Sequence, residues 1–290
     1  SGAVLLLLEG IRYMKKRISK LAIVLILSTV LFFFTGDKGF MAVKMQGYEA
    51  LKVFAHIKSS EFTPEFNIYE TEHFIIKYTD KDEDSVRDIA GIFEKSYKVE
   101  GMHYGFYPKD KTIVFVYDDQ ESMWDYQQSV KGQAVMGLYN LGIIHVLSPK
   151  AYLDSAQIFT RDYEADGPIL HEYVHRVIDY RSGGNIELWL TEGLALYEEY
   201  DVDGAEWAKG FSYERHYTAH ELRNDFMELD ETQSYRQSYD IVRRLIEQRG
   251  RKSMNRMLDE LKYGSTLDEA FFRIYGEDLN EYIDSGAWKR

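Results

Sequence analysis

Cysteine is absent from the 290-residue chain. This absence excludes disulfide bonds, thiolate nucleophiles and zinc sites built from cysteine. The glycine motifs G-x-G-x-x-G and the P-loop are absent too, so nucleotide chemistry has no support. A basic surface is also lacking. The net charge is −13, and five of the bases lie within residues 1–20, so the remainder is more acidic still. We therefore expect no nucleic-acid partner.

A long uninterrupted apolar run occurs only near the N-terminus, at Leu21–Phe34, directly after a cluster of basic residues. Its 14 residues match the apolar part of a signal peptide and are short for a membrane span. We predict that residues 1–35 form a leader containing a membrane anchor or a signal segment. Met14 resembles a natural start, so residues 1–13 are given no structural role. Because the positive charge precedes the apolar run, the rest of the chain is expected outside the cytoplasm, either anchored to the cell membrane or secreted.

Residues 36–65 are expected to connect this leader to a single domain, residues 66–290, and to contain a helix near 46–58. The first part of that domain, residues 66–165, alternates between strand and helix patterns. Strands are expected at 73–79, 111–119, 135–140 and 142–149, and helices at 84–104 and 123–128. The tripeptide Asn140-Leu141-Gly142 predicts a hairpin turn between the last two strands.

Residues 166–290 have helical patterns throughout, interrupted by glycines that indicate helix ends. Helices are expected at 168–181, 188–200, 212–228, 235–249, 251–263, 266–275 and 277–287. The predicted fold class is α+β: a β-rich N-terminal lobe with a small mixed sheet, followed by an all-α C-terminal lobe. A site is expected in a cleft between the two lobes.

The segment "HEYVH" begins at His171 and places His175 four residues later. On a helix these two imidazoles lie on one face, one turn apart, and can bind the same tetrahedral metal ion. Glu172 is rotated by about 100° from His171, so it lies near such an ion and can act as a general base. The helix also carries an apolar stripe, so a packed helix that merely contains two histidines is the competing interpretation.

A third ligand is available in "WLTEGLA", where Glu192 stands among residues of buried type. It lies 17 residues after His175, which leaves room for a turn and a second, antiparallel helix. Glu187, before that helix, is a weaker alternative. Glu198 and Glu199 are expected on an exposed, charged face. Two histidines and one glutamate on two helices form a ligand set typical of hydrolytic zinc sites.

These two segments together resemble the gluzincin metallopeptidases, the peptidase MA-like group related to aminopeptidase N and thermolysin. The resemblance implies a zincin-like fold, zinc bound by His171, His175 and Glu192, and Glu172 as the base. Members similar to aminopeptidase N also carry a tyrosine near the start of a later helix, whose hydroxyl stabilises the oxyanion. By that resemblance Tyr235 in "SYRQSYD" is the candidate, with Tyr239 as the alternative.

Two departures from the family pattern affect the expectations. The chain lacks the Gly-x-Met-Glu-Asn segment that holds the substrate amino terminus in the aminopeptidases, so an endopeptidase is favoured. Position 196, four residues after Glu192, is leucine, where thermolysin-like enzymes carry an acid that orients a zinc-binding histidine. Asp179 could take that role, or be an exposed acid near a helix end.

We therefore expect a zinc-dependent metallopeptidase that acts on peptide or protein substrates and attaches to the membrane through its N-terminal segment. The alternative is a non-catalytic binding or regulatory protein of zincin fold at the membrane surface. His216 and His220 also stand four residues apart, but no glutamate lies between them, and we expect them to be solvated or capping. His145, on a predicted edge strand, is more readily explained as a buried histidine than as a substrate contact. No oligomeric state is predicted.

Overall fold

The structure, a computed structural model, describes residue 39 and residues 41–59, 63, 65–127, 130–151 and 167–289. The chain divides into two compact units, Ser1–Phe54 and Ala55–Arg290. Residues 41–59 are helical, in agreement with the helix expected near 46–58. The leader predicted for residues 1–35 lies outside the described residues. Within the described ranges, no helix has both the length and the apolar character needed to cross a membrane.

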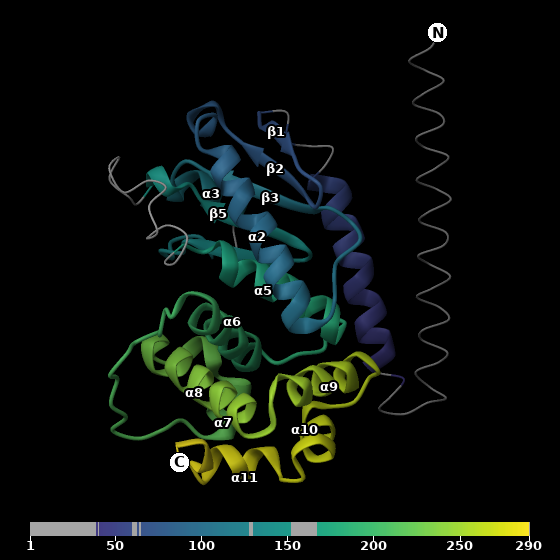
Figure 1. Cartoon of the computed structure of the whole chain (residues 1–290), viewed down its shortest axis with the longest axis vertical. Coiled ribbons are helices and arrows are strands. Elements are labelled where there is room, and N and C mark those ends of the chain that lie inside the picture. Colours follow the sequence, from purple (N-terminus) through teal and green to yellow (C-terminus); the bar gives the residue numbers. More distant parts are fainter. Residues whose placement is uncertain are drawn as a thin grey trace. The chain divides into compact units, whose positions relative to one another are not determined.

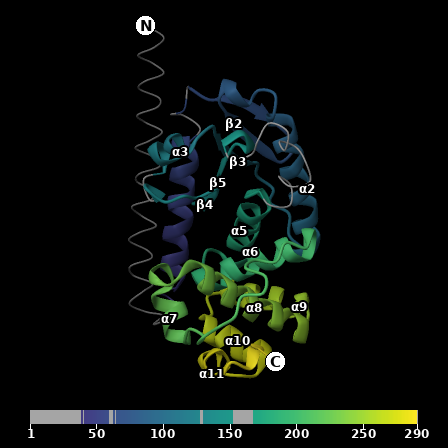
Figure 2. The same cartoon turned by 90° about the vertical axis from the view of Figure 1, so that its left-hand side faces the viewer.

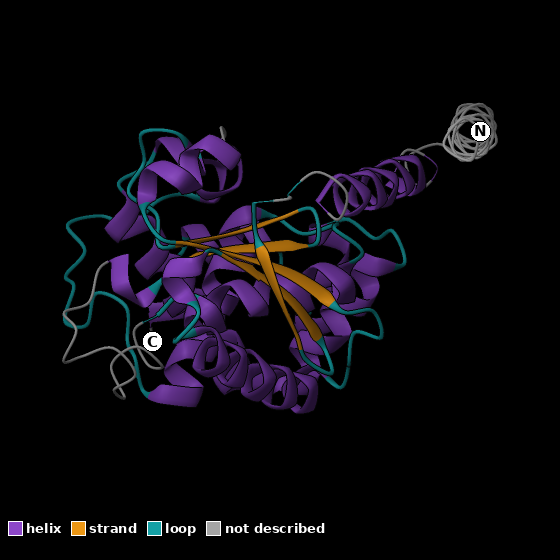
Figure 3. Cartoon of the chain, turned by 90° about the horizontal axis from the view of Figure 1, so that it is seen from above, coloured by secondary structure: helices purple, strands orange, loops and turns teal. Residues whose placement is uncertain are grey.

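A five-stranded mixed sheet lies in the second unit, with the strand order β1-β2-β3-β5-β4. The central strands β2, β3 and β5 are parallel, and β1 and β4 pair antiparallel at the two edges. Seen from above, the strands form one twisted sheet (Figure 3). The bounds are β1 Asn67–Glu70, β2 Phe74–Tyr78, β3 Thr112–Tyr117, β4 Gly137–Asn140 and β5 Ile143–Leu147. The mixed sheet is as predicted, except that β1 was not expected from its short and largely exposed sequence.

Side chains along β3 alternate between the two faces of the sheet, as the two-residue period of a strand requires. Val114 and Val116 belong to the core cluster that also contains helices α2 (Val86–Tyr104) and α5 (Ile169–Ser182). Phe115 and Tyr117 belong to a smaller aromatic cluster on the other face, together with Met123 of α3 (Gln120–Tyr126). Helices therefore cover both faces of the sheet.

His145 of β5 is buried in the smaller cluster. Its ring stacks on Phe115 with the ring centroids 5.3 Å apart, and its Nδ1 lies 2.8 Å from the hydroxyl oxygen of Tyr117. The expectation of a buried strand histidine is confirmed. The expectation of an edge position is wrong, because β4 lies outside β5 and takes the edge.

The hairpin between β4 and β5 turns through two residues with left-handed backbone. Leu141 has a φ of 48° and Gly142 a φ of 88°. Positive φ at both central positions is the geometry whose twist matches that of the flanking strands. The predicted hairpin is confirmed. The turn sets the register of β4 against β5, and β4 also contacts α5.

The remaining helices follow α5 along the chain, and most of them match the predicted positions. They are α6 Leu188–Asp203, α7 Ala219–Asn224, α8 Glu231–Arg249, α9 Arg251–Lys262, α10 Leu267–Tyr275 and α11 Leu279–Asp284. Within the second unit, α8 to α11 gather at the end away from the sheet, with α5 between them (Figures 1 and 2). A single core cluster runs from the sheet through α5 into these helices, so the predicted division into two lobes is not confirmed.

The helix predicted for 212–228 is wrong. Residues 211–218 lack helical structure, and the short helix α7 begins after Thr218. Thr218 and Glu221 form a capping box, in which each side chain binds the backbone N–H of the other. The backbone of Tyr217 is held instead by the side chain of Gln237, through two hydrogen bonds of 2.7 Å. These side-chain partners replace the hydrogen bonds that a helix would have supplied.

Candidate metal centre

Helix α5 carries the "HEYVH" segment through the middle of the core. Its apolar stripe, Leu170, Val174, Val177 and Ile178, is buried, so this is a packed helix as well as a carrier of histidines. Glu172 and His175 are buried too, at 6% and 8% exposure. The packing therefore holds the polar side chains in fixed positions.

A tight reversal brings α6 back along α5. Gly183 ends α5 with a φ of 65°, and Gly184 follows with a φ of 71°. This left-handed backbone is readily accessible only to glycine. The side chain of Asn185 then donates hydrogen bonds of 2.9 Å to the backbone oxygens of Leu261 and Ser265. These bonds attach the reversal to α9 (Arg251–Lys262) and to the loop that follows it.

The reversal places Glu192 of α6 against both histidines. Its Oε2 lies 3.1 Å from Nε2 of His171 and 3.5 Å from Nε2 of His175. The ligand atoms of these three residues all lie within 4.8 Å of one another. Glu192 is 7% exposed, as its apolar sequence neighbours indicated. Two imidazole nitrogens and one carboxylate oxygen thus converge on one point, a donor set suited to zinc.

The other nitrogen of each imidazole has a partner of its own. Nδ1 of His171 lies 3.1 Å from Oε1 of Glu199, and Nδ1 of His175 lies 2.9 Å from the hydroxyl of Thr191. Such partners fix the ring orientation, so that Nε2 is directed toward the metal position. The structure therefore supplies the surroundings that a metal-binding histidine pair requires.

This arrangement corrects two expectations. Neither Glu198 nor Glu199 belongs to an exposed face. Glu198 is fully buried, and Glu199 is turned toward His171, because it lies seven residues after Glu192 and so shares its side of the helix. Asp179 does not take the role of the missing acid. It is buried, and its carboxylate accepts a hydrogen bond from the hydroxyl of Tyr139 of β4.

The electrostatics of the cluster favour a bound cation. Burial alone would lower the pKa of His171, but the carboxylates of Glu199 and Glu192 raise it well above the ordinary value. Burial alone would raise the pKa of Glu192, but the two histidines lower it far below the ordinary value. The carboxylates thus favour positive charge at His171, and a divalent ion bound there would supply such charge.

Tyr235 and Tyr239 lie in different surroundings on α8. Burial raises the pKa of Tyr235, and the nearby charges of Glu192, Glu231 and Glu172 raise it further. The ring of Tyr235 packs against Phe226, with the ring centroids 5.4 Å apart. Tyr239 is fully buried, and its hydroxyl accepts a hydrogen bond from Arg243. Of the two phenols, Tyr235 is the one whose pKa is raised by the carboxylates of Glu192 and Glu172.

The alternative candidates for metal ligands, Glu187, His216 and His220, lie outside the metal cluster. Glu187 accepts hydrogen bonds from Arg223 and from the indole of Trp189. His216 lies before α7 and its Nε2 is 3.0 Å from the backbone oxygen of Asp284. His220 is exposed on α7, and the described residues contain no metal-type cluster with either of these two histidines.

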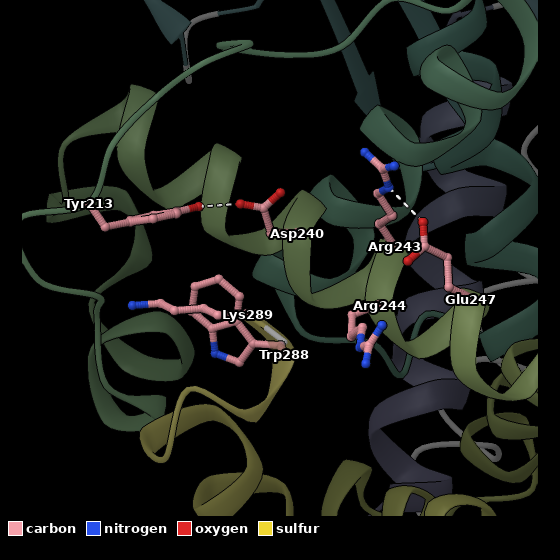
Figure 4. A pocket seen from close by; sticks show the side chains of 7 residues that line it. All are labelled: Tyr213, Asp240, Arg243, Arg244, Glu247, Trp288 and Lys289. Atoms are coloured by element: carbon pink, nitrogen blue, oxygen red, sulfur yellow. Dashed lines mark hydrogen bonds and ion pairs between the residues drawn. The ribbon is translucent and has the colours of Figure 1, made fainter.

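A pocket of about 410 Å³ lies beside α8 and does not include the metal cluster. It is lined by Tyr213, Asp240, Arg243, Arg244, Glu247, Trp288 and Lys289 (Figure 4). Both carboxylates of the lining are paired with arginines, Asp240 with Arg236 and Glu247 with Arg243, and Tyr213 donates a further hydrogen bond to Asp240. We assign no chemistry to this pocket.

Replacing Glu199 with glutamine is expected to weaken zinc binding by about 10- to 100-fold, because the charged acceptor that orients His171 is lost. Isothermal titration of metal-free protein with zinc measures the change. Glu228→Gln, which removes one negative charge at an exposed position, is the matched control and should bind zinc as the wild type does. Equal affinity in Glu199→Gln would show that His171 needs no such partner.

Comparison with known proteins agrees with the geometry. The chain has no match among curated proteins. A family model for the peptidase MA superfamily matches residues 103–289, which include α5, α6 and α8 with the whole metal cluster. Since the match covers most of the chain, the protein belongs to the peptidase MA superfamily.

Proposed function

We propose that the chain is a zinc-dependent metallopeptidase of gluzincin type that cleaves within peptides. The observation that carries the proposal is the convergence of Nε2 of His171, Nε2 of His175 and the Glu192 carboxylate, with each Nδ1 bound elsewhere. When bound, zinc would act as a Lewis acid on the substrate carbonyl and lower the pKa of water. Membership of the superfamily supports the same assignment.

Glu172 is the residue placed to move the proton. It stands next to His171 on α5, is almost fully buried, and interacts electrostatically with both histidines and with Glu192. In the proposed reaction its carboxylate accepts a proton from the attacking water and passes it to the leaving amine. Tyr235 keeps its proton, since its pKa is raised, and its hydroxyl donates a hydrogen bond to the oxyanion.

Strand β4 offers a place for the substrate backbone. In the described part of the chain it is an edge strand, and it contacts α5. A Cβ atom at Gly137, its first residue, would lie 2.6 Å from Oε1 of Glu172. An extended peptide added to this edge would therefore pass close to the general base. An extracytoplasmic location, with attachment through the N-terminal segment, remains part of the proposal.

The test combines metal content with cleavage of a peptide pool. We expect one zinc ion at this site, loss of cleavage after chelation, and internal fragments in the product profile. His171→Ala should lose the ion and the activity, while the control His220→Ala, at an exposed histidine, should keep both. Zinc bound to a protein that cleaves no peptide would contradict the proposal and favour a non-catalytic role. Release of single terminal residues would contradict internal cleavage.

The close approach of Gly137 to the general base gives a second check. In Gly137→Ala the new methyl group would overlap Oε1 and Cγ of Glu172 and Cβ of Pro168, at 2.6 to 2.7 Å. We expect the carboxylate to be displaced and cleavage to fall by about 100-fold, since a shift of about 1 Å has effects of that size. Zinc content should be unchanged. Initial rates and zinc analysis measure both, and full activity would mean that β4 can move away.

A further inference from the structure

A second cluster of metal-binding side chains lies where α2, α6 and α9 meet. Glu100 and His103 come from α2 and Glu198 comes from α6. Nδ1 of His103 lies 2.8 Å from Oε2 of Glu198 and 3.8 Å from Oε1 of Glu100. One ligand atom from each of the three residues lies within 4.8 Å of the others. The cluster was not predicted, because His103 and Glu198 are 95 residues apart.

The burial of the two carboxylates is what requires explanation. Glu100 and Glu198 are both 0% exposed. Both carboxylate oxygens of Glu100 are buried, and neither has a hydrogen-bond partner among the described residues. A buried carboxylate without a partner is strongly unfavourable unless a cation or a proton neutralises it. The burial of the Glu100 carboxylate therefore indicates a ligand that the described protein atoms do not supply.

Arg251 of α9 does not provide that neutralisation. Its guanidinium pairs with Oε1 of Glu198 and lies 2.8 Å from Oδ2 of Asp201. These contacts do not include Glu100, which has no hydrogen-bond partner, and they leave Oε2 of Glu198 directed to His103. Three carboxylates, those of Glu100, Glu198 and Asp201, face one guanidinium and one imidazole, so the formal charges of the cluster sum to a negative value whether or not the imidazole carries a proton. That excess matches a divalent cation.

The surroundings of His103 resemble those of a metal ligand. Nδ1 faces the two buried glutamates, while Nε2 lies 3.9 Å from Oδ2 of Asp201 on the other side of the ring. The backbone oxygen of His103 accepts a hydrogen bond of 3.0 Å from Asn255 of α9, which holds the end of α2 in place. The imidazole is 25% exposed, so an ion could enter from solvent past its edge.

We propose that Glu100, His103 and Glu198 bind a second divalent transition-metal ion, with zinc as the ion the donor set fits, and that this ion joins α2 to α6. One imidazole nitrogen and two carboxylate oxygens suit zinc or manganese and do not suit calcium, which takes only oxygen ligands. The ion neutralises Glu100. It is separate from the ion held by His171, His175 and Glu192.

The test uses the full chain with the first site removed. In His171→Ala/His175→Ala, metal-free protein titrated with zinc is expected to bind one ion and to gain thermal stability. Adding Glu100→Gln should weaken that binding by at least about 10- to 100-fold, the loss that follows removal of a residue that merely orients a ligand, because here a ligand itself is lost. Adding Glu94→Gln is the matched control, since Glu94 also lies on α2 and pairs with a histidine, His73, outside any such cluster. This control should leave binding unchanged.

The alternative is that Glu100 simply carries a proton. In that case the double histidine variant binds no zinc, and Glu100→Gln raises the melting temperature equally with and without zinc. Either result overturns the proposal. Because Glu100→Gln removes an unpaired buried charge, the variant is expected to fold, and circular dichroism of the metal-free protein checks this. Failure of peptide cleavage in the wild type would leave the second-site result intact, so the two proposals are tested independently.

Discussion

Glu172→Gln is expected to lower the rate of peptide cleavage by about 10²- to 10⁴-fold while zinc stays bound, which is the range for losing a general base. Glutamine has nearly the same shape as glutamate but cannot accept and return a proton at neutral pH. His171, His175 and Glu192 are unaltered, and their contacts do not involve Glu172. The variant therefore separates proton transfer from metal binding.

The measurement is a pair of assays on the same preparation, initial cleavage rates and zinc per chain. Glu121→Gln, an exposed position on α3, is the control for the loss of one negative charge. It should keep the wild-type rate. Wild-type activity in Glu172→Gln would show that Glu172 is not the general base. Loss of zinc from the variant would mean that Glu172 is a ligand.

Gly193→Ala is expected to destabilise the protein by about 3 kcal/mol, near the upper part of the range for overpacked positions. Gly193 follows Glu192 on α6, at the place where α6 crosses α8. A Cβ atom there would lie 2.5 Å from the backbone oxygen of Ser238 and 2.8 Å from Cγ2 of Val242. Backbone cannot rotate away as a flexible side chain can, so the two helices would have to separate.

Urea unfolding of the metal-free protein measures this effect, and zinc titration measures its consequence for the site. Separation of α6 from α8 would move Glu192, so zinc binding should weaken together with stability. Gly91→Ala is the matched control, because Gly91 is also helical and a Cβ there meets nothing within 4 Å. It should gain about 0.5–1 kcal/mol from the better helix propensity of alanine. Equal stability of wild type and Gly193→Ala would contradict the close helix crossing.

The ligand cluster could be predicted because each of its residues is marked by its near neighbours in the sequence. The spacing of His171 and His175 follows from one helical turn, and Glu192 was distinguished by its apolar neighbours. Glu199 could have been found by the same reasoning, since seven residues return to the same face of α6. The capping box of Thr218 and Glu221 was also visible in the sequence and would have moved the start of the overlong predicted helix from residue 212 to the residue after Thr218.

Other features could not be predicted because their partners lie far away in the chain. His103 and Glu198 are 95 residues apart, and the sheet, α5 and the reversal lie between them in the chain. The contact of Gly193 with Ser238 depends on the angle at which two helices cross, and no local pattern encodes it. The same is true of Thr191, whose role depends on the rotation of α6 against α5.

The central position of α5 has a consequence for the exchange of its amide hydrogens. This helix packs against the sheet, α2, α6 and α9, and most of its side chains are buried. Its amides should therefore exchange with deuterium only when the whole domain unfolds, and more slowly than those of the peripheral helix α7. Chelation should leave this protection in place, because packing and not the metal holds the helix. Rapid exchange in α5 after zinc removal would instead show that the ion is needed to complete the fold.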